Sequence, residues 1–536
     1  MHQEFKLRKF ILKLGFINRR AVLLNLLMAS LLLVTLLLSL RNISHSLWSD
    51  EAFTSEIAHK ETFTEIIDTA MKRRPYPPLY FFLVHESIKY SNDEFGLRFP
   101  SVIFGILAVM ATFLLGKALF DNSIGFIAAL LFVSTPGIFR SFVDANAYAM
   151  LAFSVTASTY FLYIAMLSQR IRHWMGFIIF SIVSIGTHMF AIFHVIGQII
   201  GAFCLSGSWE PDMPQDSSVG LLKSIHKKKR LVICSLTILV VWIIWIYFYF
   251  TNRGLTTPFN FQKIFSAKTF ILCPALYFGY LSKGKLIQLI LWSVLQLFGS
   301  MCCFLENRKK FVFLFILIIV PTFLISFAMI ALLPFFAFRY GIGMFPLGCI
   351  LAACSIRFLY LLTLTNLKRY LTIVLLSLLL IVYTITGFIT IFDKNSDLLE
   401  IQDWRGAGKY LSSHIKKRDI LFFVESWRYL SLKYYFKTPS KLYLVENDKQ
   451  LIENVKHLFE EQSPGKEKIQ RRQFWVVLSS LENKNALIEK FFGDLKIPAK
   501  ENAKLLIKKL RENFNIESID VLHFKRISIV QFSAKS

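Results

Sequence analysis

Residues 21–51 read AVLLNLLMASLLLVTLLLSLRNISHSLWSDE. No charged side chain occurs in residues 21–40, and an apolar run of about 18 or more residues is long enough for a helix to cross a bilayer. The preceding residues are basic, as in a signal peptide, but the run lacks a convincing small-residue cleavage site. We therefore expect an uncleaved first span, followed by a polar segment that carries the adjacent carboxylates Asp50 and Glu51.

The rest of the chain repeats the pattern of the first span. Its 536 residues are 55% hydrophobic with a mean hydropathy of +0.52, which is far too apolar for one soluble core. We predict a polytopic α-helical membrane protein with about eleven spans. The expected spans are residues 21–40, 100–120, 124–139, 147–167, 174–187, 191–204, 231–249, 286–304, 311–333, 341–361 and 370–392. A further apolar stretch at 270–281 is typical of an interfacial or re-entrant segment.

The formal net charge of +26 is compatible with nucleic-acid binding or with membrane topology. The basic residues gather between the apolar runs, in clusters at 6–20, 170–172, 227–230, 308–310 and 368–369. Loops rich in Lys and Arg stay on the cytoplasmic side of a membrane, and this placement makes every span alternate correctly. We therefore expect a cytoplasmic N-terminus, an external C-terminus and no nucleic-acid partner. Composition favours a bacterial inner membrane, although an endoplasmic reticulum location has the same physics.

The composition changes after the last expected span. Short apolar runs, typical of buried strands, alternate there with helical patterns. The strands are expected at 420–424, 442–445 and 474–478, and the helical patterns include 426–436 and 485–492. About 140 residues of this kind make a small domain of common size.

We accordingly divide the chain into two domains. Residues 1–392 form a transmembrane catalytic domain with its first outer loop at 41–98, and residues 393–536 form a small extracytoplasmic α/β domain. All seven cysteines lie within or beside apolar runs, and none falls in the C-terminal domain. We therefore expect neither a disulfide framework nor a cysteine-based metal site.

The loop between the first two spans carries the strongest local signal. Loops of this length are uncommon unless they are functional, and residues 79–88 are amphipathic enough to lie along the membrane surface. Two carboxylates beside lipid are costly to desolvate, so Asp50 and Glu51 need a reason to be there. One reason is chemistry. The other is capping, with Ser49 or Asp50 starting a helix and Glu51 in its first turn, and the two roles are compatible.

Three motifs of this segment resemble the first outer loop of the GT-C glycosyltransferases. They are W-S-D-E-A at 48–52, R-P-Y-P-P-L-Y at 74–80 and E-F-G-L-R-F-P-S at 94–101. The pattern is most similar to the protein O-mannosyltransferases and the lipid A aminoarabinose transferases. The resemblance continues in order through D-A-N-A-Y at 144–148, T-H-M-F at 187–190, R-Y at 339–340 and D-W-R at 403–405.

The resemblance implies transfer of a sugar from dolichyl- or undecaprenyl-phosphate to an acceptor hydroxyl or amine, usually with inversion at the anomeric carbon. The acceptor would be an extracytoplasmic lipid, glycan or protein. A phosphate leaving group needs little protonation, so the site mainly needs a base for the acceptor's proton and cations for the departing charge. Asp50 matches the family's catalytic aspartate and is the expected base. Glu51 is expected to orient an outer-loop partner or to help bind the sugar.

A second carboxylate, Asp144, follows a span that runs outward, so we expect it near the same surface as Asp50. There it would share the work of base with Asp50, or bind the acceptor or a metal. The alternative is a cap for the helix that begins near Ala147. Many relatives carry an arginine where this sequence has Asn146, so this motif offers no arginine to the carrier phosphate. Tyr148 closes the motif and is a candidate for substrate binding.

Guanidinium groups are the expected phosphate partners, because they offer fixed, bidentate donors. The candidates are Arg73, Arg74, Arg98 and Arg339. Arg339 is preferred, since it directly precedes a span and forms with Tyr340 an Arg-Tyr pair that recurs in the family. Arg98 is expected to be a structural partner of Asp50 or Glu51. Each arginine could instead be an interfacial anchor.

Three more residues are candidates for substrate contact. Tyr76 stands where relatives carry His or Lys before Pro-Pro, and Arg74 is expected to supply the missing cation. His85 and His188 are expected on the outer side as substrate contacts or metal ligands, although a lone histidine beside aromatic residues is more often simply packed. Neither has the spacing of a zinc site. We expect no cofactor and no resident metal, with a divalent ion left open because the relatives differ in metal dependence.

A transporter or flippase of lipid-linked saccharides is the main alternative to a transferase. Transporters usually place ionisable groups or broken helices near the bilayer midplane, whereas the carboxylates of the motifs above are expected in loops. A third hypothesis is a membrane protein that kept the scaffold and lost the activity. The C-terminal domain could bind the acceptor, cover the mouth of the site or stabilise the outer loops, and we expect it to face the acceptor. Membrane lipids are further expected partners.

Overall fold

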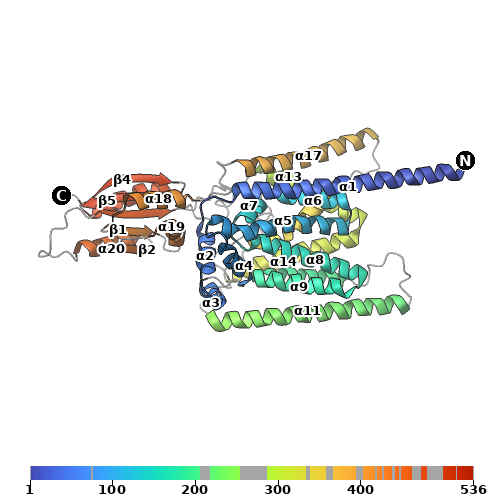
Figure 1. The fold of residues 1–536 in the computed structure, drawn as a ribbon, viewed down its shortest axis with the longest axis horizontal. Coiled ribbons are helices and arrows are strands. Elements are labelled where there is room, and N and C mark those ends of the chain that lie inside the picture. The colour runs from blue at the N-terminus through green and yellow to red at the C-terminus, as the bar shows by residue number, and fades with distance from the viewer. Residues whose placement is uncertain are drawn as a thin grey trace. The chain divides into compact units, whose positions relative to one another are not determined.

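The computed structural model describes two compact units of the chain (Figure 1). The helical unit comprises Met1–Ile43 and Ile57–Lys394, and the sheet unit comprises Ser44–Glu56 and Asn395–Ser536. The described residues are 2–73, 77–205, 218–253, 286–332, 338–357, 366–393, 402–416, 419–424, 428–437, 441–445, 448–460, 473–479, 499–514, 516–524 and 526–534.

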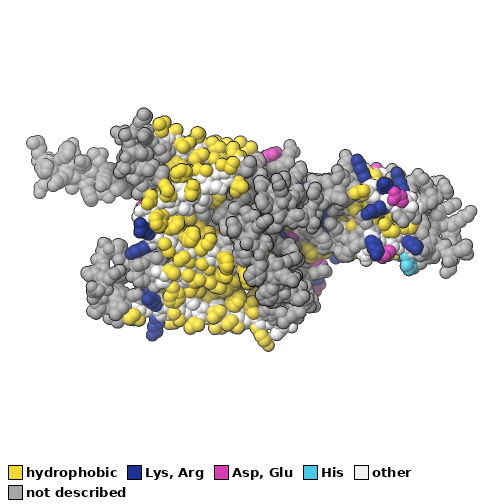
Figure 2. Space-filling model, turned by 180° about the vertical axis from the view of Figure 1, so that it is seen from behind, with side chains coloured by type: hydrophobic (Ala, Val, Ile, Leu, Met, Phe, Trp, Pro, Cys, Tyr) yellow, Lys and Arg dark blue, Asp and Glu magenta, His cyan; other side chains and the backbone are white. Residues whose placement is uncertain are grey.

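The helical unit holds the membrane spans, and the chain is a multi-pass membrane protein. Seven helices among the described residues are long and apolar enough to cross a membrane, or eight spans if one bent pair is counted. The seven belong to α1 (His2–Asn42), α5 (Glu94–Leu119), α8 (Tyr148–Ser168), α11 (Ser218–Arg253), α13 (Leu286–Glu306), α14 (Arg308–Leu332) and α17 (Asn366–Phe392). Figure 2 shows an apolar belt over this unit, with Lys and Arg side chains gathered at one end of the belt.

Two of the eleven expected spans are shorter than a full crossing helix. α9 (Ile171–Thr187) has 17 residues and α10 (Ala191–Leu205) has 15. Both begin and end close to the residues expected from the sequence, so the apolar pattern located them correctly. Their length alone does not identify them as spans. The segment expected to be interfacial or re-entrant, 270–281, lies outside the described residues.

The prediction of one continuous helix at 341–361 is wrong over the part of this range that the structure describes. The chain instead forms three consecutive pieces, η2 (Phe338–Met344), α15 (Phe345–Ala353) and η3 (Cys354–Arg357). Pro346 lies in the first turn of α15 and has no N–H with which to continue a helix from the residues before it. Every residue of α15 is buried, so this apolar stretch packs inside the helical unit rather than against lipid.

The span expected at 124–139 is bent. α6 (Asn122–Ser134) and α7 (Pro136–Val143) meet at an angle of 73°. Pro136 opens α7 and cannot donate a backbone hydrogen bond to α6, so the helix stops and restarts in a new direction around Thr135. The restart ends α7 directly before Asp144.

Glycine allows α17 to approach α6 at backbone distance. A Cβ added to Gly387 would lie 1.8 Å from the carbonyl oxygen of Ser134, where no flexible side chain can yield. We expect Gly387→Ala to destabilise the protein by about 1–3 kcal/mol through overpacking, measured as a lower melting temperature in detergent. Gly186→Ala is the control, because an added Cβ there would meet only the Leu79 side chain, at 3.4 Å. An unchanged melting temperature of Gly387→Ala would contradict this packing.

Three short helices follow the first span. They are α2 (Ser49–Ala58), α3 (Phe63–Arg73) and α4 (Leu79–Ile88). The amphipathic stretch noted at 79–88 forms α4, which packs against α5 and α9 within the helical unit. The first eight residues of α2 belong to the sheet unit, which the sequence did not predict.

The described part of the sheet unit contains a five-stranded sheet of order β2-β1-β3-β5-β4. Its strands are β1 (Ile420–Val424), β2 (Lys441–Val445), β3 (Gln473–Ser479), β4 (Ile516–Phe524) and β5 (Ile527–Ala534). The first three are parallel and match the strands predicted from the sequence, whereas β4 and β5 add an antiparallel hairpin. The helical pattern expected at 485–492 lies outside the described residues.

Helices cover both faces of this sheet. Neighbouring strand residues point to opposite sides, so each strand contributes apolar side chains to both faces. On one face, Phe422 and Val476 pack with residues of α20 (Asp448–Glu460) and α22 (Ala499–Asn513). On the other face, Phe423 and Trp475 pack with α18 (Trp404–His414) and α19 (Tyr429–Tyr435). The sheet unit thus holds α18 and α19 rigidly on one side of its core.

Candidate functional site

The acidic pair lies in the first turn of α2, within the sheet unit. Asp50 is 5% exposed and Glu51 is 0% exposed. The backbone N–H of Trp48 donates to Oε2 of Glu51 at 3.3 Å, and Nε2 of His45 lies 3.9 Å from the same oxygen. Glu51 therefore reaches back to the turn before its own helix and caps it, whereas the sequence suggested Ser49 or Asp50 as the cap and Glu51 only as a residue of the first turn.

The side chain of Glu51 is occupied by the turn that precedes α2, and burial without such partners would be costly. Asp50 sits one residue earlier in the same turn and is almost fully buried. The backbone N–H groups at the start of α2 place a partial positive charge beside both carboxylates.

Asp144 forms a buried ion pair within the helical unit. Nε of Arg140 donates to Oδ2 of Asp144 at 2.8 Å, and the two side chains are 8% and 6% exposed. Arg140 lies one helical turn earlier, on α7, so the pair closes the end of that helix. Arg140 was not among the residues predicted from the sequence, although its i, i+4 spacing ahead of Asp144 was a usable signal.

The alternative role of Asp144 as a helix cap is wrong. The N-cap of α8 is Ala147, and no side chain caps this helix with a hydrogen bond. The backbone of this loop is instead fixed by hydroxyl groups. Ser101 donates to the carbonyl of Asn146 at 3.1 Å and shares a 2.7 Å hydrogen bond with Tyr80.

Four of the expected substrate-binding residues meet in the helical unit. The ring of His188 lies 6.0 Å from that of Tyr148 and 4.9 Å from that of Tyr340, measured between centroids. The guanidinium carbon of Arg339 lies 5.3 Å from the centroid of Tyr148, close enough for a cation–π interaction. Residues far apart in the sequence thus form one cationic and aromatic cluster, which we call the Arg339 cluster.

The hydrogen bond at Nδ1 of His188 indicates which ring nitrogen carries the proton. The backbone N–H of Phe190 donates to Nδ1 of His188 at 3.2 Å, so in the neutral ring the proton sits on Nε2. A second buried histidine, His194, lies beside η2, where a Cβ added to Gly343 would be 3.0 Å from its Nε2. His194 was not predicted from the sequence, because it lies inside an apolar helix without a motif around it.

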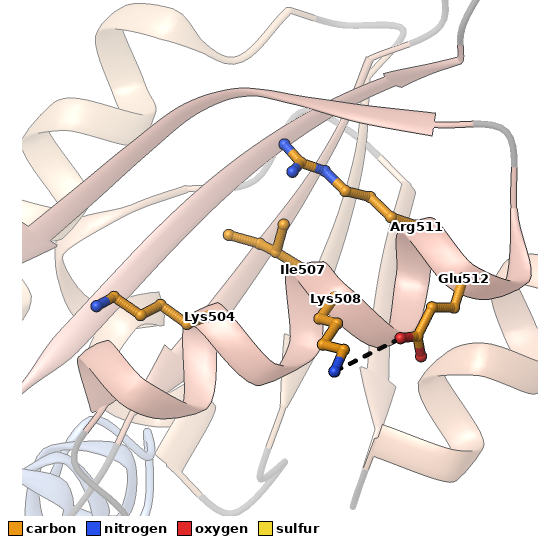
Figure 3. A pocket seen from close by; sticks show the side chains of 5 residues that line it. All are labelled: Lys504, Ile507, Lys508, Arg511 and Glu512. Atoms are coloured by element: carbon orange, nitrogen blue, oxygen red, sulfur yellow. Dashed lines mark ion pairs between the residues drawn. The ribbon is translucent and has the colours of Figure 1, made fainter.

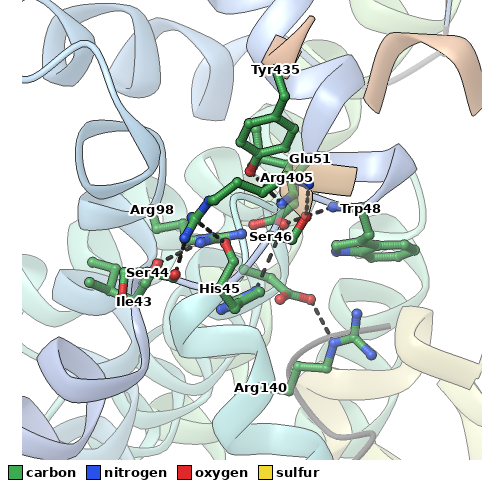
Figure 4. Close-up of polar contacts among 12 residues, drawn as sticks. Ile43, Ser44, His45, Ser46, Trp48, Glu51, Arg98, Arg140, Arg405 and Tyr435 are labelled. Carbon is green, nitrogen blue, oxygen red and sulfur yellow. Dashed lines mark hydrogen bonds and ion pairs between the residues drawn. The ribbon is translucent and has the colours of Figure 1, made fainter. Parts of the chain in front are cut away.

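Arg98 is fully buried on α5 and donates from Nη1 to the carbonyl oxygen of Ile43. This hydrogen bond holds the chain at the end of the first span, directly before the acidic segment begins (Figure 4). Arg98 therefore anchors the backbone at the end of the first span. Its expected partnership with Asp50 or Glu51 stays a prediction.

His85 has the contacts of a packed structural residue. Its Nδ1 forms a 2.8 Å hydrogen bond with the carbonyl of Ala58, and its ring lies 5.7 Å from that of Phe63. The histidine thereby ties α4 to the end of α2. Arg74 and Tyr76, two further expected contacts, lie outside the described residues, and the side chain of Arg73 does so as well.

A cationic hollow lies on α22 of the sheet unit (Figure 3). Its volume is about 490 Å³, and it is lined by Lys504, Ile507, Lys508, Arg511 and Glu512. Glu512 offsets part of the positive charge, since its Oε1 lies 3.9 Å from Nζ of Lys508. The helical unit has a second, apolar hollow of about 290 Å³ between α6 and α17.

A family model matches part of this chain. Residues 75–245 match the dolichyl-phosphate-mannose-protein mannosyltransferases. No curated protein matches the chain in sequence. The matched segment contains the D-A-N-A-Y and T-H-M-F motifs, and therefore Asp144, Tyr148 and His188.

Solved structures share the fold over nearly the whole chain. ArnT from Cupriavidus metallidurans in the apo state is 12% identical with a TM-score of 0.54, and 96% of this chain and 98% of that chain are covered. The same protein bound to undecaprenyl phosphate is 13% identical with a TM-score of 0.56, covering 94% and 97%. Arabinofuranosyltransferase AftD from Mycobacteria is 12% identical with a TM-score of 0.50, covering 94% of this chain and 39% of that chain. The chain resembles the GT-C glycosyltransferases, as its motifs predicted.

Proposed function

We propose that this chain is a membrane glycosyltransferase that moves a sugar from a polyprenyl-phosphate to an acceptor hydroxyl or amine outside the cytoplasm, with inversion at the anomeric carbon. The observation that carries the proposal is the buried acidic pair, Asp50 and Glu51, at the start of a helix that directly follows the first span of a GT-C fold. The family match to polyprenyl-phosphate-dependent mannosyltransferases and the undecaprenyl phosphate bound to ArnT support the donor class.

In the proposed reaction, Asp50 takes the proton of the acceptor as the acceptor oxygen or nitrogen attacks the anomeric carbon. A bond forms between acceptor and sugar, the bond between sugar and phosphate breaks, and its electron pair leaves with the polyprenyl phosphate. Attack from the face opposite the leaving group inverts the anomeric centre. Glu51 contributes by holding the first turn of α2, and hence Asp50, in place.

The departing phosphate needs positive charge and hydrogen-bond donors more than it needs a proton. We assign this role to the Arg339 cluster, in which a guanidinium is held against the Tyr148 ring and His188 offers an N–H at Nε2. Arginine suits the task, because its planar group donates two parallel hydrogen bonds to phosphate oxygens. The reaction as proposed draws on no resident metal or cofactor.

The proposed orientation places the N-terminus in the cytoplasm and the sheet unit outside, in a bacterial inner membrane. The basic clusters between spans and the cationic end of the apolar belt support this orientation (Figure 2). We assign the acceptor side of the reaction to the sheet unit, where the cationic hollow on α22 favours an acceptor that carries negative charge.

The test is a transfer assay with the purified protein in liposomes that contain a polyprenyl-phosphate sugar labelled in the sugar. Addition of an acceptor should release free polyprenyl phosphate in step with labelled product. Movement of the labelled lipid to the other leaflet, with no release of polyprenyl phosphate for any acceptor class, would support the transporter hypothesis instead. Neither release nor movement would favour a scaffold without activity.

A further inference from the structure

One arginine of the sheet unit holds the backbone immediately before the acidic pair (Figure 4). The N–H of Arg405 donates to Oγ of Ser46 at 3.1 Å. Its Nη2 donates to the carbonyl oxygens of Ser44 at 3.2 Å and of His45 at 3.4 Å. A single residue of α18 therefore contacts three consecutive residues, although it lies 361 positions away from the first of them.

Tyr435 of α19 completes this attachment. Its hydroxyl oxygen accepts a hydrogen bond from the N–H of Leu47 at 2.9 Å, and its ring centroid lies 5.7 Å from the guanidinium carbon of Arg405. The ring thus supports the side chain that binds the preceding residues. Together, Arg405 and Tyr435 fix residues 44–47, and we call this set of contacts the latch.

The latch is built on a rigid base. Asp403 caps α18 by accepting the N–H of Gly406 at 2.7 Å, which sets the direction in which Arg405 leaves the helix. Trp404 between them is fully buried, with its ring 5.7 Å from that of Phe423 in the sheet. The D-W-R motif therefore supplies a cap, a core anchor and a donor in three consecutive residues.

The latch leads directly to the carboxylates. His45, whose carbonyl binds Arg405, places its Nε2 3.9 Å from Oε2 of Glu51. Trp48, the next residue after the latched segment, donates its N–H to that same carboxylate. Any loosening at residues 44–47 would consequently loosen the turn from which Asp50 projects.

We propose that Arg405, assisted by Tyr435, is a positioning residue for Asp50, and that the C-terminal domain thereby takes part in catalysis in addition to facing the acceptor. The proposal rests on the proposed function for Asp50. A group held in productive geometry reacts far faster than one held loosely, and small displacements cost about tenfold to a hundredfold in rate.

The test compares Arg405→Met and Tyr435→Phe with a matched control, Lys409→Met, which removes an exposed cation one turn further along α18. Two quantities are measured on the full-length protein: hydrogen exchange of the peptide that spans residues 44–51, and kcat and KM of transfer. For Arg405→Met we expect faster exchange in this peptide and a kcat lowered about tenfold to a hundredfold, with KM for the donor unchanged. Tyr435→Phe should show the same changes in weaker form, Arg405→Lys a partial recovery, and Lys409→Met neither effect.

Exchange and turnover separate the possible failures. Exchange of residues 44–51 that equals wild type in both variants overturns the latch, whatever the activity. Faster exchange with an unchanged kcat overturns the positioning role. If Arg405→Met unfolds the sheet unit, Tyr435→Phe decides the question, because it removes one hydroxyl and leaves the core packing in place. If the wild-type protein transfers no sugar, the proposed function fails, while the exchange measurement still reports on the latch.

Discussion

Asp50→Asn is expected to reduce transfer by about a hundredfold to ten-thousandfold while the polyprenyl-phosphate donor still binds. The amide has nearly the shape of the carboxylate and fits the same 5%-exposed position, but it cannot take up the acceptor's proton. The loss should therefore appear in kcat, with little change in KM for the donor. The measurement is release of polyprenyl phosphate by the purified variant, with donor affinity measured separately.

Glu61→Gln is the matched control for this variant. It neutralises an exposed carboxylate shortly after α2 and should leave turnover unchanged. Full turnover of a correctly folded Asp50→Asn would remove Asp50 from the chemistry and leave the acidic pair with a purely structural role. A loss of folding in Asp50→Asn would show as a lower melting temperature, which the control would not share.

Arg140→Met is expected to destabilise the protein by about 3–5 kcal/mol, because it leaves the Asp144 carboxylate buried without its 2.8 Å partner. Asp144→Asn alone should also destabilise. The double variant Arg140→Met with Asp144→Asn should recover much of the loss, since the Asp144 charge that Arg140 balances is then removed as well. Melting temperatures of the four proteins in detergent form a double-mutant cycle that isolates the pair.

The cycle also bears on function. If the ion pair only stabilises the end of α7, the double variant should regain activity along with stability. If Asp144 shares in substrate binding, activity should stay low after stability has returned. Losses that simply add in the double variant would contradict a coupled pair.

The membrane spans were predictable because hydropathy is a local property of the sequence. Apolar runs located both ends of α8 and α17 closely and the C-terminal end of α5, whereas α5 begins at Glu94, before the expected span at 100–120. The same reasoning failed where an apolar run is buried inside protein, as in α15, because hydropathy does not distinguish lipid from a protein core. The bend before α7 had a readable cause in Pro136, but its direction depends on packing.

The sheet shows a similar division. β1 and β3 are continuous apolar runs buried on both faces, and such runs stand out in a sequence. β4 mixes acidic, polar and apolar residues at the edge of the sheet, so its pattern resembles that of a loop. Edge strands are defined by pairing with a neighbour, and pairing is not visible in the sequence of one strand.

Site residues that lie in family motifs could be predicted from the sequence. Contacts that depend on the tertiary structure could not. Family motifs pointed to Tyr148, His188 and Arg339, and these residues do lie together in the helical unit. The latch at Arg405 could not be predicted from the sequence, because Arg405 binds backbone carbonyl groups. Every residue has a carbonyl group, so only the fold determines which ones Arg405 meets.

The side of the membrane on which the acidic segment lies can be measured directly. Glu61→Cys and Lys309→Cys, each in a background with the seven native cysteines replaced by serine, are treated in intact cells with a membrane-impermeant maleimide. We expect the cysteine at 61, three residues after α2, to react from outside, and the cysteine at 309 to react only once the membrane is opened. Labelling at 61 only after the membrane is opened would place Asp50 in the cytoplasm and contradict transfer to an external acceptor.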